Sequence, residues 1–103
     1  MVSQLRIYTI NRGMMDSFVR LFEENIRPLH DKLGIPVESA WVNEDRTEFI
    51  WVRSFNSKEE IAQKEAAYFS SPERKALGDK PQTHIAKIEV RVIESALVPA
   101  TTA

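Results

Sequence analysis

Two short segments of the chain each place an arginine two residues from an aromatic side chain. Arg6 precedes Tyr8, and Trp51 precedes Arg53, within stretches rich in β-branched and aromatic residues. Residues at i and i+2 of a β-strand point to the same face of the sheet, so each pair presents a ring beside a guanidinium group. Such a wall could bind a small aromatic anion. Because Tyr, Trp and Arg are also enriched in protein interfaces, the same side chains could instead pack against a second subunit.

Three titratable side chains could move a proton or carry a buried charge. His30 follows Pro28 near the end of a predicted helix, where an imidazole can act as acid or base near neutral pH or can bind the helix-terminal carbonyls. His84 lies beside a loop at the start of the last predicted strand, facing either a pocket or solvent. Glu65 projects into the apolar face of a helix, so it needs a partner such as a sheet arginine, or it acts as a pocket base. We take His30 and His84 as the candidate catalytic residues.

Hydrophobic periodicity predicts the elements that position these side chains. Alternation of apolar residues predicts strands over residues 3–10, 37–43, 48–55 and 83–97, and spacings of three and four predict helices over 15–33, 57–69 and 72–77. Pro28 predicts a kink of the first helix near His30, and Ser57 with Glu60 has the pattern of a capping box. Trp41, on the second strand, is expected to be a core aromatic residue.

The order of these elements predicts an α+β fold of the ferredoxin-like βαββαβ type, with a four-stranded antiparallel sheet and helices on one face. Helices on one side leave the other face of the sheet uncovered, and we expect a second chain to cover that face. Whether the face that carries the arginines and aromatic rings meets this partner or a ligand stays open. The chain is predicted to be a single domain over residues 1–98, with a frayed tail at 99–103.

Composition excludes several classes of function. The net charge of -1 argues against nucleic-acid binding, and the two histidines lack metal-ligand spacing, so we expect no metal. The sequence has no glycine-rich phosphate loop, and we expect no cofactor. It contains no cysteine, no secretory signal pattern and no apolar run long enough to cross a bilayer, so the expected location is the cytoplasm, without membrane association.

Several short motifs, taken in order, resemble those of the NIPSNAP family within the dimeric α+β barrel superfamily. They are Leu5-Arg6-Ile7-Tyr8-Thr9 with Gly13, Pro28-Leu29-His30 with Gly34, Trp41, the stretch from Glu48 to Ser57, Ala67-Tyr68-Phe69 with Ser71-Pro72-Glu73, and Glu89-Val90-Arg91. Arg74 and Ile61 depart from the tryptophan and arginine common in relatives. The resemblance implies a homodimer in which the sheet packs on its twofold mate and closes a barrel. It implies no single activity, because the wider superfamily includes cofactor-free monooxygenases, isomerases and noncatalytic proteins.

Two functional hypotheses follow. In the first, a cleft of roughly 300 Å³ between sheet and helices binds a small aromatic or acidic molecule, and the protein acts as a cofactor-independent monooxygenase or isomerase. Its candidate ligand-binding residues are Arg6, Tyr8, Trp41, Trp51, Arg53, Glu65 and Tyr68. In the second, the protein is a noncatalytic dimeric domain whose aromatic residues and arginines serve assembly.

Overall fold

The computed structural model describes residues 1–97 and contains one antiparallel four-stranded sheet. Its strands are β1 (Val2–Ile10), β2 (Val37–Val42), β3 (Glu48–Phe55) and β4 (Ile85–Ile93), in the order β2-β3-β1-β4. Each neighbouring pair is antiparallel, so β1 and β3 form the centre and β2 and β4 form the edges. This topology confirms the predicted ferredoxin-like fold. The predicted fraying at 99–103 lies outside the described residues.

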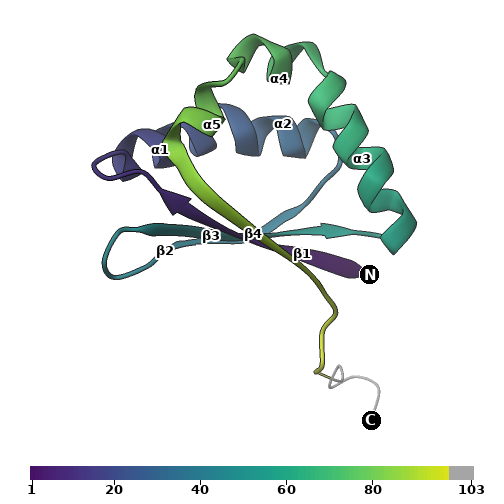
Figure 1. Ribbon diagram of the computed structural model, residues 1–103. Helices are drawn as coiled ribbons and strands as arrows, with labels where there is room; N and C mark the ends of the chain where they lie inside the picture. The colour runs from purple at the N-terminus through teal and green to yellow at the C-terminus, as the bar shows by residue number, and fades with distance from the viewer. Residues whose placement is uncertain (98–103) are drawn as a thin grey trace.

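All the described helices lie on one side of this sheet (Figure 1). They are α1 (Met15–Leu21), the π-helical turn η1 (Phe22–Ile26), α2 (Arg27–Lys32), α3 (Lys58–Ser70), α4 (Pro72–Leu77) and α5 (Lys80–His84). Within residues 1–97, no helix is both long and apolar enough to cross a membrane.

The first predicted helix is interrupted one turn earlier than the sequence suggested. Pro28 lies in the first turn of α2, and the widened turn η1 precedes it, with the Arg27 N–H bonded to the carbonyl of Phe22. The predicted kink near His30 is therefore wrong in position. Proline has no N–H and its ring crowds the carbonyl four residues earlier, so the strain is relieved in the preceding turn by a change to i→i+5 hydrogen bonding.

Two further local predictions are wrong. The segment before the last strand forms α5, because Pro81 has the φ angle of a first helical turn, and β4 consequently begins at Ile85 and ends at Ile93. Ser57 does precede α3, but its side chain makes no capping hydrogen bond, so the predicted capping box is absent from the described residues. Ser71 does cap α4, since its hydroxyl accepts a hydrogen bond from the Arg74 N–H.

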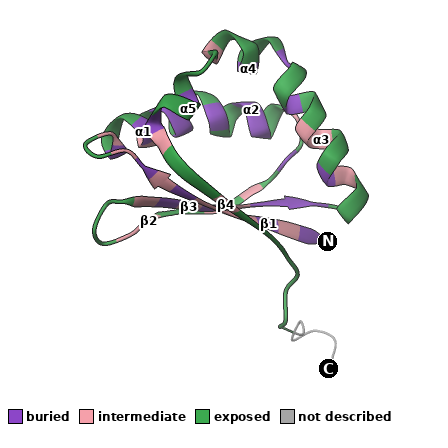
Figure 2. Ribbon diagram, viewed as in Figure 1, coloured by how far each residue is buried: buried purple, intermediate pink, exposed green. Residues whose placement is uncertain are grey.

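The core lies between the sheet and the first helical segment. Its centre is Phe18 of α1, whose ring is fully buried and packs edge-to-face with Tyr8 at 5.8 Å and with Phe49 at 5.0 Å between centroids. Phe22 lies 5.1 Å from Trp51 in the same manner. Figure 2 shows the resulting pattern, with buried residues on the inner sides of the helices and on β1 and β3, and exposed residues along most of β4.

No helix of the described residues lies on the outer face of the sheet. Leu5 and Ile7 of β1 lie opposite Val52 and Ile50 of β3, all half-buried, and Trp41 of β2 lies opposite Ile50. Trp41 is 64% exposed, so the prediction that it is a core aromatic residue is wrong. On an edge strand with its side chain on the uncovered face, even a tryptophan has nothing among residues 1–97 to bury it.

Candidate functional site

The predicted arginine and aromatic pairs share one face, but it is the face covered by helices. Arg6 lies directly opposite Trp51, and Tyr8, Trp51 and Arg53 are all buried. α1, η1 and α3 of the same chain cover these side chains, so they face a pocket between sheet and helices, which is one of the two alternatives that the sequence left open. The alternation of side chains along β1 and β3 correctly predicted which residues share a face. Which of the two faces the helices cover depends on how the helices pack against the sheet.

Gln4 joins the two arginines through one oxygen atom. Its Oε1 accepts a hydrogen bond from Arg6 Nη1 at 2.9 Å and another from Arg53 Nε at 2.8 Å. Arg6 Nε also donates to the hydroxyl oxygen of Tyr8 at 2.8 Å. Because Gln4, Arg6 and Tyr8 alternate along β1, their side chains form a continuous hydrogen-bonded row beneath the helices. These hydrogen bonds hold the Arg6 side chain in place through Nε and Nη1. The third nitrogen of its guanidinium group, Nη2, makes no hydrogen bond within residues 1–97.

His30 is held by bonds to both ring nitrogens. Arg53 Nη1 lies 3.0 Å from Nε2, and a guanidinium can only donate, so Nε2 carries the lone pair. Nδ1 therefore carries the proton and donates to the carbonyl oxygen of Ile26 at 2.8 Å. Burial, reinforced by the charge of Arg53, lowers the pKa of His30 to about 4. At neutral pH, His30 is thus a neutral side chain that orients Arg53.

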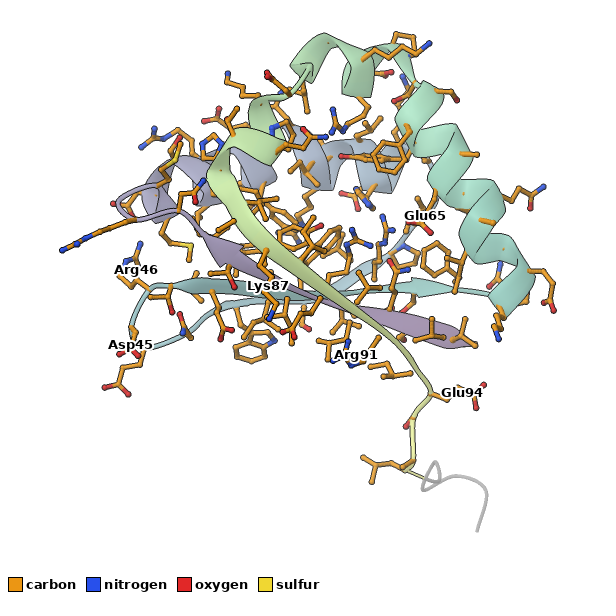
Figure 3. The ribbon with its side chains drawn as sticks, in the orientation of Figure 1. Asp45, Arg46, Glu65, Lys87, Arg91 and Glu94 are labelled. Carbon is orange, nitrogen blue, oxygen red and sulfur yellow. The ribbon has the colours of Figure 1, made fainter. Side chains whose placement is uncertain are left out.

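Glu65 of α3 faces the sheet and pairs with the arginines. Its Oε2 accepts a hydrogen bond from Arg53 Nη2 at 2.9 Å and lies 3.9 Å from Arg6 Nη1. Figure 3 shows Glu65 on the inner side of α3, whereas Arg91 of β4 lies on the opposite side of the sheet. This confirms the salt-bridge alternative for Glu65. Burial and the charge of Arg6 lower the pKa of Arg53, yet a guanidinium stays protonated at any ordinary pH.

Arg74 brings a third guanidinium to the same region. The cap at Ser71 starts α4 immediately after α3, which turns Arg74 back over Tyr68 and Phe69 at 5.9 and 5.5 Å from the ring centroids. Its Nη1 donates to the carbonyl of Gly78 at 2.9 Å. Arg74 is only 7% exposed, and it makes no ion pair with a carboxylate within residues 1–97. Burial raises the pKa of Tyr68, so its hydroxyl stays protonated at neutral pH.

These side chains enclose a cavity of about 90 Å³ between the sheet and the helices. Its wall includes Arg6, Tyr8, His30, Trp51, Arg53 and Tyr68. Arg74, Phe69 and Ile88 also line it, and Phe69 of α3 and Ile88 of β4 are about half exposed, so the cavity opens between these two side chains. The cavity is smaller than the predicted cleft of roughly 300 Å³. The indole N–H of Trp51 is buried and has no hydrogen-bond partner within residues 1–97.

Two predicted site residues lie elsewhere. His84 is buried at the end of α5, where Nδ1 donates to the carbonyl of Lys80 at 2.7 Å and Nε2 forms a hydrogen bond with the Ser17 hydroxyl at 2.8 Å. It does not line the cavity. Trp41 is on the outer face of the sheet, as described above. No group of three or more His, Asp or Glu side chains in the described part of the chain is arranged to hold a metal.

A larger hollow, of about 540 Å³, lies between the β1–α1 loop and the β2–β3 turn. Asp45 and Arg46 line it, and Figure 3 shows them at the end of the hairpin, remote from Glu65. Arg46 forms an exposed ion pair with Asp16. None of the predicted site residues lines this hollow, and its charges are paired or exposed to solvent, so we assign it no role.

Sequence reasoning missed Gln4 and Arg74. The available signal for Gln4 was its position two residues before Arg6, on the same strand face, because a buried amide needs hydrogen-bond partners. Arg74 lies in a short helix outside the regular βαββαβ pattern, and no periodicity identifies a buried arginine there. Its position depends on how α4 folds back over α3.

Comparison with known proteins agrees with this architecture. The profile of the NIPSNAP family matches residues 3–98. A NIPSNAP family protein from Agrobacterium tumefaciens superimposes with a TM-score of 0.86 at 17% identity, covering 96% of this chain and 97% of that one. An uncharacterised NIPSNAP domain protein from Burkholderia xenovorans gives 0.83 at 14% identity, covering 96% and 99%.

The fold also extends beyond this family. A putative antibiotic biosynthesis monooxygenase from Nitrosomonas europaea superimposes with a TM-score of 0.70 at 11% identity, covering 94% of this chain and all of that one, 100%. At such identities the likeness shows a shared fold and no shared activity. No curated protein matches the sequence. The match of the family profile to nearly the whole chain settles the classification: this protein belongs to the NIPSNAP family.

Proposed function

We propose that the cavity between sheet and helices binds the anionic group of a small organic acid. The observation that carries this proposal is the imbalance of charge at the cavity. Arg6, Arg53 and Arg74 line it, and within residues 1–97 Glu65 pairs with Arg6 and Arg53 while Arg74 has no carboxylate partner. A buried charge without a partner is costly, so an arrangement with excess positive charge favours an anionic occupant. His30 adds no charge, because its pKa is about 4.

Arg6 and Arg74 have N–H groups that can donate hydrogen bonds to a bound anion. Arg53 bonds to Gln4, His30 and Glu65, which makes it a structural anchor. Arg6 keeps Nη2 free within the described residues, and Arg74 faces aromatic rings in place of a carboxylate. A carboxylate that accepts hydrogen bonds from guanidinium groups in an apolar pocket forms strong, charge-assisted contacts.

The walls and the size of the cavity define the rest of the ligand. Tyr8, Trp51 and Tyr68 supply aromatic surface beside the arginines, which suits a flat or apolar group attached to the acid. A cavity of about 90 Å³ encloses only part of a ligand, because sites that enclose whole drug-sized molecules measure about 300–1,000 Å³. The acid group therefore enters first, and the remainder projects through the opening.

The test is a titration of the isotope-labelled protein with benzoate, followed by NMR. We expect the indole N–H signal of Trp51 and the backbone signals around Arg74 to shift with saturation. Benzamide has the same ring without the charge and should shift them at least tenfold more weakly, since a tenfold change corresponds to about 1.4 kcal/mol, the scale of one charge-assisted hydrogen bond.

Variants locate the bound anion. Arg74→Gln should weaken benzoate at least tenfold, whereas Arg91→Gln, which removes an exposed arginine from the other face of β4, should leave the affinity unchanged. Equal binding of benzoate and benzamide, or equal effects of the two variants, would overturn the proposal.

Catalysis is tested on the same complexes. The ring nitrogens of His30 are both engaged, so its role in this geometry is to position Arg53. We propose that any reaction uses Arg6 to stabilise negative charge on a substrate oxygen, as enolisation during isomerisation or cofactor-independent oxygenation requires. Oxygen uptake and hydrogen–deuterium exchange at the carbon next to the acid, measured with bound aromatic and keto acids, distinguish these two reactions from binding alone.

A second candidate function, assembly, is favoured by the outer face of the sheet. Leu5, Ile7, Ile50 and Val52 form an apolar centre there, with the exposed Trp41 beside it. We propose that this face packs against the same face of a second copy to form a homodimer. Light scattering at micromolar concentration tests it, and a single species of 11.8 kDa would refute it.

A further inference from the structure

Within residues 1–97, one edge of the sheet is apolar and uncovered on the same side as the cavity. Ile88, Val90 and Val92 of β4 lie opposite Tyr8, Arg6 and Gln4 of β1, so they occupy the helix side of the sheet. They are nevertheless 48%, 38% and 51% exposed. Figure 2 shows that β4 is exposed along most of its length. We call these three side chains the β4 row.

The β4 row is continuous with the cavity. Ile88 belongs to both, since it lines the cavity and begins the row. Val90 lies directly opposite Arg6, whose Nη2 is free within residues 1–97. Phe69, 53% exposed, contributes an aromatic ring at the same opening. A molecule with its acid group at Arg6 and a body too large for the cavity would therefore extend along apolar side chains.

We infer that the ligand is an amphipathic carboxylic acid with an extended apolar chain, whose acid group enters the arginine-lined cavity and whose chain lies along the β4 row. This inference rests on the proposed function and specifies its ligand class. The charge of the cavity requires the acid, the volume of about 90 Å³ excludes the chain, and the apolar row accommodates it. A compact, fully polar acid would use the arginines and leave the row exposed to water.

The β4 row is on the opposite side of the sheet from the face proposed for dimer formation. Ile93, which follows Val92, lies opposite Ser3 on that outer face and is 38% exposed. The two proposals thus use different side chains of the same strand. Substitutions at neighbouring positions of β4 can test them separately.

The experiment compares butanoate, hexanoate and octanoate by the same NMR titration. A fully buried methylene strengthens binding about fourfold, and a chain lying on one surface buries about half of each methylene, so affinity should rise about twofold per methylene. Octanoate should therefore bind about 16-fold more tightly than butanoate. Octan-1-ol and octylamine, with the same chain but no negative charge, should bind at least tenfold more weakly than octanoate.

Two matched variants locate the chain. Val90→Thr with Val92→Thr keeps β-branched side chains, so the strand is retained, while the row becomes polar. This double variant should remove most of the dependence on chain length and leave butanoate affinity unchanged. Ile93→Thr, on the outer face, should alter neither.

The outcomes separate this inference from the proposed function. If benzoate and all three chain lengths bind with similar affinity, the row is not the chain site and the inference fails while anion binding stands. If neither benzoate nor any member of the series binds, both fail. If the double variant changes only the concentration dependence of self-association, the row is an interface between copies and the inference is overturned.

Discussion

Removing the charge of Glu65 is the most direct test of the site, because the Glu65 carboxylate pairs with both Arg6 and Arg53. We consider Glu65→Gln, which removes one negative charge and keeps an amide oxygen that can accept the hydrogen bond from Arg53 Nη2. Breaking a fully buried ion pair costs about 3–5 kcal/mol. The Glu65 side chain is 29% exposed and the hydrogen bond survives, so we expect the free energy of unfolding to fall by about 2 kcal/mol. For a domain of this size, that lowers the melting temperature by about 10 °C.

The same change should strengthen anion binding. Removing Glu65 raises the excess positive charge at the cavity by one, so benzoate should bind about tenfold more tightly at low ionic strength. Stability and affinity thus change in opposite directions, whereas simple structural damage would lower both.

Urea denaturation at neutral pH, followed by tryptophan fluorescence and circular dichroism, measures the first effect, and the benzoate titration measures the second. Glu24→Gln is the control, since Glu24 is exposed and makes no ion pair within residues 1–97, and we expect a change below about 0.5 kcal/mol. The reasoning would be refuted if Glu65→Gln matched Glu24→Gln in stability, or if it weakened benzoate.

Three further predictions concern the core, acid stability and assembly. The pKa of His30 is lowered from 6.5 to about 4, so the unfolded chain binds a proton that the folded protein excludes; stability is complete above pH 6.5, and about 3 kcal/mol is lost between pH 6.5 and 4. His30→Gln should remove this portion of the pH dependence in denaturant titrations, and identical pH profiles would contradict the assignment. Phe18→Ala should lower the free energy of unfolding by about 3–5 kcal/mol, because the ring is fully buried; a loss below about 1 kcal/mol would show that the core can collapse around the gap. Trp41→Ser should shift light scattering toward the 11.8 kDa monomer without lowering monomer stability, and unchanged association would exclude the outer face as the dimer contact.

Much of the fold follows from local patterns in the sequence. Alternation along β1 and β3 predicted both strands to within one residue, and it placed Arg6 with Tyr8 and Trp51 with Arg53 on shared faces. The position of Glu65 on the apolar side of a helix predicted either a salt bridge or a pocket base, and the structure shows the salt bridge to Arg53. Such predictions succeed because strand and helix periods are properties of the backbone, and neighbouring side chains within one element inherit them.

The sequence did not determine which face of the sheet the helices cover, because periodicity separates two faces without assigning them. Tertiary packing decided this: α1, η1 and α3 lie over the arginine face, burying the residues that had been candidates for a dimer interface and exposing Trp41. Tertiary packing also determines the size of the cavity, and it places Arg74 of the short helix α4 in the cavity wall. Motifs and periods fixed the order of the elements and the residues that share a strand face, since these depend on local geometry. The charge balance of the site depends on contacts between segments distant in the chain, and only the folded structure shows that the described arginines outnumber their carboxylate partners there.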